Sequence, residues 1–139
     1  PWNVRFAVPE GDAAFAPRPG VPFPDLIAEM ALSAQDFSRK FQRSAVKRAK
    51  RGGYLRNVAI ALGNLASNAN RNLAEQALHA LSHALRHDDE PLVRGHAAWA
   101  LGQIGTPPAR HALSAAIREE TNAWVLAEVR AALDSILKI

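Results

Sequence analysis

The pentapeptide Ala59-Ile-Ala-Leu-Gly63 recurs thirty-nine residues later as Ala98-Trp-Ala-Leu-Gly102. The segment that contains the second copy, 93–101, aligns again with 125–133. The apolar residues of each copy have the spacing of a helix with one buried side. We therefore expect each copy to be the first helix of a two-helix unit that repeats along the chain.

Each of the first two copies is followed by a second predicted helix. Apolar residues at helical spacing place these helices at 73–86 and 108–118. Asp88-Asp-Glu-Pro91 and Gly105-Thr-Pro-Pro108 are turn signals that precede helix starts. A period of roughly 30 to 40 residues made of two helices is typical of an α-solenoid. The predicted fold class is thus all-α, an α-solenoid of HEAT-like helical-hairpin repeats.

The beginning of the chain differs from the repeats in composition. Residues 1–24 contain six of the nine prolines together with Gly11 and Gly20, and such a composition cannot sustain a helix. We expect an extended, proline-rich linker at 1–24 and a helical repeat domain at 25–139. The spacing of apolar residues predicts a first short helix at 26–32.

Positive charge is concentrated in one part of the sequence. Seven Lys and Arg residues lie between residues 39 and 51, and the stretch 37–74 has nine and no Asp or Glu, although the whole chain contains 13 acidic residues. A cluster of cations attracts the phosphates of an anionic polymer and holds them through counterion release. This segregation, more than the net charge of +4, predicts a nucleic-acid-binding surface. The alternative is a solvated face that only favours solubility.

We predict that these cations lie on a single basic helix. It begins after Ser33, which can cap it, and it ends at Gly52-Gly53. Its inward side is expected to carry Phe37, Phe41 and Val46. The outward side then carries a stripe of cations at helical spacing: Arg39, Arg43, Lys47 and Lys50.

Composition excludes several kinds of site. The chain has no cysteine, so disulfides, thiolate metal sites and cysteine nucleophiles are excluded within these residues. Its apolar runs are short and interrupted by charge, so we expect no membrane-spanning helix and a cytoplasmic protein. No glycine-rich phosphate loop, catalytic triad or paired catalytic carboxylates can be recognised, so no catalytic residue is predicted.

Two segments carry a resemblance to a known family. They are Arg43-Ser-Ala-Val-Lys-Arg-Ala-Lys-Arg-Gly-Gly-Tyr-Leu-Arg-Asn-Val-Ala-Ile-Ala-Leu-Gly-Asn64 and Pro91-Leu-Val-Arg-Gly-His-Ala-Ala-Trp-Ala-Leu-Gly102. Both resemble the C-terminal region of epoxyqueuosine reductase. Pro1-Trp-Asn3 also fits, because the family's last motif for binding an iron–sulfur cluster ends in cysteine followed by these three residue types. One departure is Ala45, where the family often has proline.

The resemblance implies a parent protein with further domains. Members of the family have a cobalamin-binding catalytic domain and a ferredoxin-like domain with two [4Fe-4S] clusters, and they reduce epoxyqueuosine to queuosine at the wobble base of transfer RNA. The linker at 1–24 would then continue from the ferredoxin-like domain, with the last cluster cysteine just before Pro1. The expected role of this chain is to bind the anticodon arm of transfer RNA, with no cofactor of its own.

The candidate residues for transfer RNA fall into two groups. The first group has two parts. Cations of the basic helix would contact phosphates, which positions RNA without reading its sequence. Two further residues lie at a predicted helix start, where free amides and the helix dipole favour phosphate. Its members are Lys47, Arg48, Lys50 and Arg51, then Arg56 and Asn57. The basic track could be extended by Arg39, Lys40 and Arg43.

The second group lies on the helix predicted around 93–101. Arg94 and His96 are candidate phosphate contacts, although His96 could instead satisfy a buried carbonyl. Trp99 is expected in the core, and stacking on an unpaired base is its alternative role.

Three histidines recur at helical spacing, at His79, His83 and His87, where adjacent imidazoles can share a metal. No fourth ligand is evident, so no metal site is predicted, and polar residues at this spacing fit a solvated face.

Two other functions fit the repeat architecture. One is a HEAT-repeat scaffold that binds a partner protein through apolar anchors and tolerates salt, unlike an RNA-binding surface. The other is a brace for the cluster domain of the same parent chain, with Trp2 and Phe6 packed against that domain.

Overall fold

The computed structural model describes residues 24–66 and 70–137, and every regular element within these ranges is helical. Three short elements come first: α2 (Leu26–Met30), α3 (Ala34–Lys40) and the 3-10 helix η2 (Ala45–Ala49). Five longer helices follow: α4 (Lys50–Ala66), α5 (Arg71–His87), α6 (Pro91–Ile104), α7 (Pro107–Glu119) and α8 (Ala123–Leu137). The predicted linker at 1–24 lies, except for Pro24, outside the described residues.

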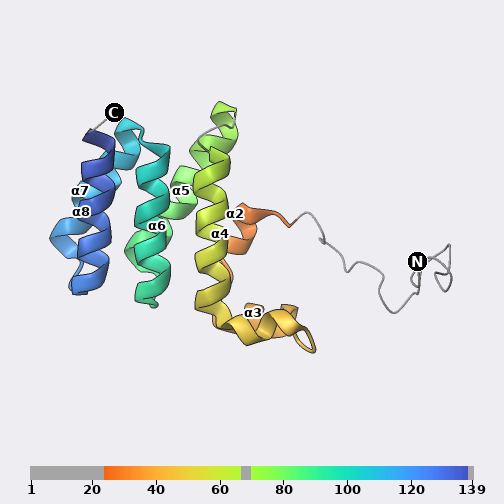
Figure 1. Ribbon diagram of the computed structural model, residues 1–139. Coiled ribbons are helices and arrows are strands. Elements are labelled where there is room, and N and C mark those ends of the chain that lie inside the picture. The colour runs from red at the N-terminus through yellow and green to blue at the C-terminus, as the bar shows by residue number, and fades with distance from the viewer. Residues whose placement is uncertain (1–23, 67–69, 138–139) are drawn as a thin grey trace, which may run out of the picture.

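The five longer helices form two layers. Helices α4, α6 and α8 lie side by side in one layer, and α5 and α7 lie behind them (Figure 1). The pairs α4–α5 and α6–α7 are helical hairpins, and α8 occupies the place of a third first helix. Helix α2 packs against α4 and α5 at one end of the stack. The predicted α-solenoid of helical hairpins is confirmed.

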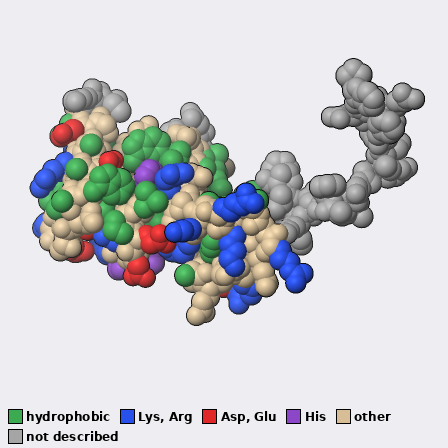
Figure 2. Space-filling view, turned by 60° about the horizontal axis from the view of Figure 1, so that its bottom comes forward, with side chains coloured by type: hydrophobic (Ala, Val, Ile, Leu, Met, Phe, Trp, Pro, Cys, Tyr) green, Lys and Arg blue, Asp and Glu red, His purple; other side chains and the backbone are tan. Residues whose placement is uncertain are grey.

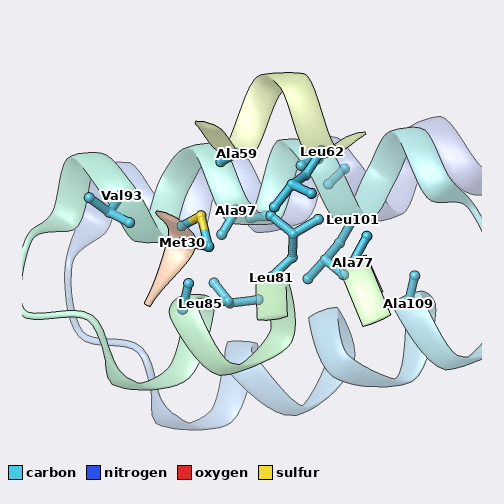
Figure 3. Close-up of a cluster of buried hydrophobic side chains, with 14 of the residues drawn as sticks. Met30, Ala59, Leu62, Ala77, Leu81, Leu85, Val93, Ala97, Leu101 and Ala109 are labelled. Atoms are coloured by element: carbon cyan, nitrogen blue, oxygen red, sulfur yellow. The ribbon is translucent and has the colours of Figure 1, made fainter. Parts of the chain in front are cut away.

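Leucines fill the space between the layers. Leu62 of α4, Leu81 of α5 and Leu101 of α6 are fully buried and lie close together in Figure 3. Each belongs to a different helix, so these side chains join the first hairpin to the second. Burying one such side chain stabilises the fold by about 1.5–3 kcal/mol relative to leaving it in water.

The glycine that ends the repeated pentapeptide marks a point of close helix approach. A Cβ atom on Gly63 would lie 2.9 Å from the Cα of Ala100, and one on Gly102 would lie 2.9 Å from the Cβ of Ala132. Both distances are shorter than ordinary carbon contacts. The repeated glycine therefore allows the backbone of α4 to lie against Ala100 of α6, and the backbone of α6 to lie against Ala132 of α8.

The helix ends follow the local sequence signals. Ser33 Oγ accepts a hydrogen bond from the Asp36 amide at 3.1 Å and caps α3, as predicted. Pro91 is the first residue of α6, and Gly105, with φ of +65°, ends that helix in the left-handed region.

The prediction of one continuous basic helix is wrong. Helix α3 ends at Lys40, and the chain passes through η2 before α4 begins. Arg43 and Lys50 have φ of 59° and 57°, in the left-handed region that residues other than glycine rarely adopt. A straight helix would hold Phe37 and Tyr54 about 25 Å apart. Instead their rings pack with centroids 5.7 Å apart, so the chain must fold back between them.

Gly52 and Gly53 do not end a helix, as was predicted, but lie in the first turn of α4. Gly52 is buried, and a Cβ atom there would overlap the carboxylate of Glu90. Its role is to leave space for that side chain. The prediction that Val46 faces inward is also wrong, since Val46 is exposed on η2.

Candidate nucleic-acid interface

The cations of α3, of the turn that follows it, of η2 and of the first residue of α4 form one exposed surface, which we call the cationic arch. All of its members are exposed: Arg39, Lys40, Arg43, Lys47, Arg48 and Lys50. Figure 2 shows Lys and Arg side chains gathered at this end of the molecule. The break at residues 41–49 bends the track, so the cations lie on a curved surface instead of along one helix.

A buried carboxylate anchors the arch to the repeats. Glu29 of α2 is 4% exposed and accepts a hydrogen bond from the Tyr54 hydroxyl at 2.9 Å. It also pairs with the ammonium group of Lys40. Burial of the phenol and its hydrogen bond to Glu29 raise the pKa of Tyr54 well above its ordinary value. This cluster joins α2, α3 and α4 and fixes where α3 lies.

Aromatic packing holds the other side of α3. The Phe41 ring lies 5.0 Å from that of Phe37 and 4.8 Å from that of Tyr54, measured between centroids. Phe37 is buried and Phe41 half-buried, so the expectation that both turn inward is confirmed. The polar side of α3 is thereby left in solvent.

Within the arch, some cations are already paired and others are not. Arg39 pairs with Asp36 and Lys40 with Glu29. Across residues 24–66 and 70–137, no ion pair is formed by the other four: Arg43, Lys47, Arg48 and Lys50. The charges of these four side chains are therefore not neutralised by an ion pair among the described residues. Lys47 also lines an open polar hollow of about 360 Å³ between α3 and η2.

Arg51 is placed differently from its neighbours, because it points into the protein. Its guanidinium donates to both Asp88 carboxylate oxygens, at 2.6 and 3.1 Å, and to Glu90 at 3.1 Å. Its Nε donates to the Leu32 carbonyl at 2.7 Å. The hydrogen bond to Asp88 raises the pKa of Arg51, against the opposing effect of burial. Arg51 therefore joins the first repeat to the turn that starts the second.

Arg94 makes the equivalent connection one repeat later. It donates to the two carboxylate oxygens of Glu120 at 2.7 and 3.1 Å, and to the Asp88 carbonyl at 2.8 Å. The Glu120 carboxylate is 7% exposed, and its hydrogen bond from Arg94 lowers the pKa of Glu120. Arg94, like Arg51, has its donors occupied within the fold.

Arg56 and Asn57 do not lie at a helix start, contrary to the expectation. Helix α4 begins at Lys50, so their backbone amides are inside the helix and have carbonyl partners there. The Arg56 Nε donates to the Asn57 side-chain oxygen at 3.1 Å. Any contact of these residues with phosphate would come from their side chains alone.

His96 and Trp99 lie on α6 at the edge of a pocket. The Nδ1 atom of His96 lies 2.9 Å from the Leu92 carbonyl oxygen, one turn earlier. The alternative expected for this histidine was a buried carbonyl, whereas this contact is exposed. Because a carbonyl only accepts, Nδ1 carries the proton. Trp99 is half-buried and packs against the hydrophobic core.

The three histidines of α5 are exposed, and the rings of His83 and His87 pack with centroids 4.7 Å apart. In the part of the chain that the structure describes, no group of three or more His, Asp or Glu side chains is placed to hold a metal ion.

The inward roles of Arg51 and Arg94 could not be seen in the charge pattern. Their carboxylate partners lie 37 and 26 residues further along the chain. The sequence nevertheless contains a pattern that could have indicated these ion pairs. An arginine occurs early in a first helix, and acidic residues fill the turn that follows the second helix of the same hairpin.

The comparisons with known proteins agree with the repeat architecture. A family model described as HEAT repeats matches residues 54–134, more than half of the chain. None of the helices among the described residues combines the length and the apolar character needed to traverse a bilayer.

Curated relatives carry the name epoxyqueuosine reductase. One from Xanthomonas campestris pv. campestris is 35% identical over 105 residues, which is 76% of this chain and 27% of that protein. One from Escherichia coli K12 is 35% identical over 103 residues, or 74% of this chain and 25% of that protein. The chain thus spans about a quarter of the length of these relatives, and the resemblance to the family is confirmed.

A solved epoxyqueuosine reductase in complex with an epoxyqueuosine-modified tyrosine tRNA stem loop superimposes with a TM-score of 0.73 at 26% identity. The match covers 87% of this chain and 30% of that one. Together with the two-layer stack of hairpins and the family match over residues 54–134, these similarities show that the chain belongs to the HEAT-repeat proteins.

Proposed function

We propose that this chain is the transfer-RNA-binding repeat domain of an epoxyqueuosine reductase, and that its cationic arch holds phosphates of the anticodon arm. The observation that carries the proposal is the group of four exposed cations that lack an ion pair among the described residues, in a stretch without acidic residues. A similar reductase has been solved with a tRNA stem loop, which supports RNA as the anionic partner.

We propose a narrower set of phosphate contacts than the sequence candidates. Lys47, Arg48 and Lys50 are the principal contacts, with Arg43 beside them and Arg56 further along α4. Arg51 and Arg94 act instead by positioning, because they hold successive repeats in place. Asn57 would contribute a neutral hydrogen bond, which adds less than a charged contact. His96 has its Nδ1 turned to the Leu92 carbonyl and is not among the proposed phosphate contacts.

The parent would be an oxidoreductase that reduces epoxyqueuosine in transfer RNA, with the chemistry outside these residues. This chain has no cysteine for an iron–sulfur cluster. The cobalamin and the two [4Fe-4S] clusters that the resemblance implies would be held by other domains of the parent.

The test is a salt-dependent titration of the purified protein with a tyrosine tRNA anticodon stem loop. A triple variant, Lys47→Gln, Arg48→Gln and Lys50→Gln, removes three charges from the arch. The slope of log affinity against log salt should become shallower by about 2 to 3, since each lost phosphate contact contributes about 0.7–0.9. Affinity at low salt should fall roughly ten-fold or more.

The matched control removes the same charge elsewhere. Arg110→Gln, Arg118→Gln and Arg130→Gln change three exposed arginines on α7 and α8. This variant should keep nearly the wild-type slope, and circular dichroism should show the same helicity in all three proteins. Equal slopes for the two triple variants, or binding that is insensitive to salt, would rule out the arch as the RNA site and favour a protein scaffold.

A further inference from the structure

A small aromatic pocket lies on the layer formed by α4, α6 and α8. It has a volume of about 210 Å³ and is lined by one residue of α4, two of α6 and two of α8: Ile60, His96, Trp99, Trp124 and Glu128. We call it the tryptophan pocket. It is smaller than the pockets of about 300–1,000 Å³ that hold drug-sized ligands, so its size suits a single planar ring system.

The pocket wall is fixed by the fold. Trp124 lies directly over Gly95 of α6, where a Cβ atom would overlap the six-membered ring of the indole. The side chain of Asn122 accepts hydrogen bonds from the backbone amides of Trp124 and Val125, both at 3.1 Å, and so fixes the first turn of α8. Despite this support, Trp124 is 42% exposed. A large aromatic surface is therefore held in place and left open to solvent.

The chemistry of the wall fits a nucleobase. Two indoles and the His96 imidazole offer aromatic faces, and the His96 ring lies 5.9 Å from that of Trp124. Stacking on aromatic side chains is how proteins hold unpaired RNA bases. Glu128 makes no ion pair among the residues that the structure describes, and its carboxylate can only accept hydrogen bonds. It would repel a phosphate and attract an amino group of a base.

The pocket lies further along α4 than the cationic arch. Arg56 precedes Ile60 by one helical turn on the same side of α4, and Lys50 lies ten residues before Ile60, or about 15 Å along the helix. A stacked strand rises about 3.4 Å per nucleotide, so this distance corresponds to about four nucleotides. Figure 2 shows, on one face, both the arch cations and a patch of hydrophobic side chains that includes a histidine.

We propose that the tryptophan pocket receives one unpaired base of the bound RNA, of the kind that carries an exocyclic amino group. Trp124 stacks on the base, and Glu128 accepts a hydrogen bond from the amino group. The inference rests on the proposed function, because the arch must hold the phosphates on either side of the base. It adds recognition of a base to a surface that otherwise reads only the backbone.

The test uses tyrosine tRNA anticodon stem loops in which one loop nucleotide at a time is made abasic. For the wild-type protein, one position should weaken binding about five-fold or more when its base is removed. Trp124→Leu should weaken binding of the intact stem loop by a similar factor, and removal of the base at that position should then have no further effect. The salt slope should not change, since no phosphate contact is lost. Ile117→Ala, an exposed apolar residue of α7, is the control and should behave as wild type.

A second variant tests the hydrogen bond without changing the shape of the pocket. At the sensitive position, the amino-bearing base is replaced by its amino-free counterpart, inosine for guanosine or uridine for cytidine. The wild type should lose affinity, and Glu128→Met, which has a similar length but no oxygen acceptor, should not distinguish the two bases.

Two results would overturn the inference. Trp124→Leu could lose the same affinity for every abasic stem loop as for the intact one, which would mean that Trp124 does not stack on a loop base. Alternatively, no loop position could be sensitive. In either case arch-dependent, salt-dependent binding would leave the proposed function standing, whereas loss of the arch effect itself would remove both.

Discussion

Cations of the basic segment differ in whether they face solvent or form ion pairs inside the fold. Lys50 and Arg51 are neighbours in the sequence, yet Lys50 is exposed and Arg51 has its donors occupied inside the fold. The difference arises because Arg51 lies over the turn at 88–90, where the side chains of Asp88 and Glu90 meet it. Charge density along a chain therefore overestimates the number of cations available to a ligand.

Replacement of Arg51 by methionine should destabilise the protein by about 2–4 kcal/mol. The side chain of Asp88 is 5% exposed, so it would be left buried without its cation, and breaking a buried pair is costly. Arg48→Met, on the exposed arch, should change the free energy of unfolding by less than about 0.5 kcal/mol. Urea unfolding of both variants checks the prediction. Similar stabilities would mean that the Arg51 ion pairs do not hold the repeats together.

The raised pKa of Tyr54 predicts that the folded protein loses stability at alkaline pH. Its pKa is raised in the folded protein, so its contribution is fully present below the unfolded pKa of about 10 and is lost as pH rises toward the folded value. The free energy of unfolding should therefore fall more steeply above pH 10 in the wild type than in Tyr54→Phe, which shares all other alkaline titrations.

The phenol can also be followed directly. Tyr54 is the single tyrosine of the chain, so its ultraviolet absorbance reports its ionisation without overlap from other phenols. Ionisation at an ordinary pH in the folded protein would contradict the buried hydrogen bond to Glu29.

At the scale of elements, the structure depends on how closely first helices approach each other. Gly63 and Gly102 occupy the same place in successive copies of the pentapeptide, and each faces an alanine of the next first helix. The repeat in the sequence is thus a repeat of helix contacts. Small residues between α4, α6 and α8 let these helices approach closely, and the larger leucines fill the space toward α5 and α7.

Two glycine substitutions on the same helix should have opposite effects. Gly63→Ala should destabilise the protein by about 1–3 kcal/mol, because its Cβ would lie 2.9 Å from the backbone of Ala100. Gly53→Ala should be neutral or stabilise it by up to about 1 kcal/mol, because its Cβ would be at an ordinary 3.7 Å from Ala49 and alanine favours the helix. Thermal and urea unfolding of the two variants measure the difference. The opposite order would show that α4 can move away from α6 without cost.

At the scale of the whole molecule, charge is divided between two regions. The arch presents cations in a stretch without acids, whereas a groove of about 360 Å³ is lined by acids and cations together: Asp88, Asp89, Glu119 and Glu120 with Arg86 and Arg94. The arch is therefore the region with an excess of one charge, because in the groove Asp88, Glu119 and Glu120 are paired with Arg51, Arg86 and Arg94.

The sequence alone determined the helical repeats. Each long helix is specified by neighbouring residues: apolar spacing defines its buried side, and Ser33, Pro91 and Gly105 mark ends or starts through local hydrogen bonds and backbone preference. Such signals act within a few residues, so they can be read without the fold. The phosphate contacts Lys47, Arg48 and Lys50 were likewise predicted from charge segregation, and they stay a prediction.

Only the tertiary structure decided what the basic segment does. Helix propensity favoured one continuous helix, but packing of Phe37 and Phe41 on Tyr54 bends the chain, and this packing involves residues of two separate helices. Ion pairs across 26 to 39 residues turned Arg51 and Arg94 inward. The tryptophan pocket likewise exists only because α4, α6 and α8 lie side by side. Contacts between residues distant in sequence depend on how the repeats stack, which no local pattern encodes.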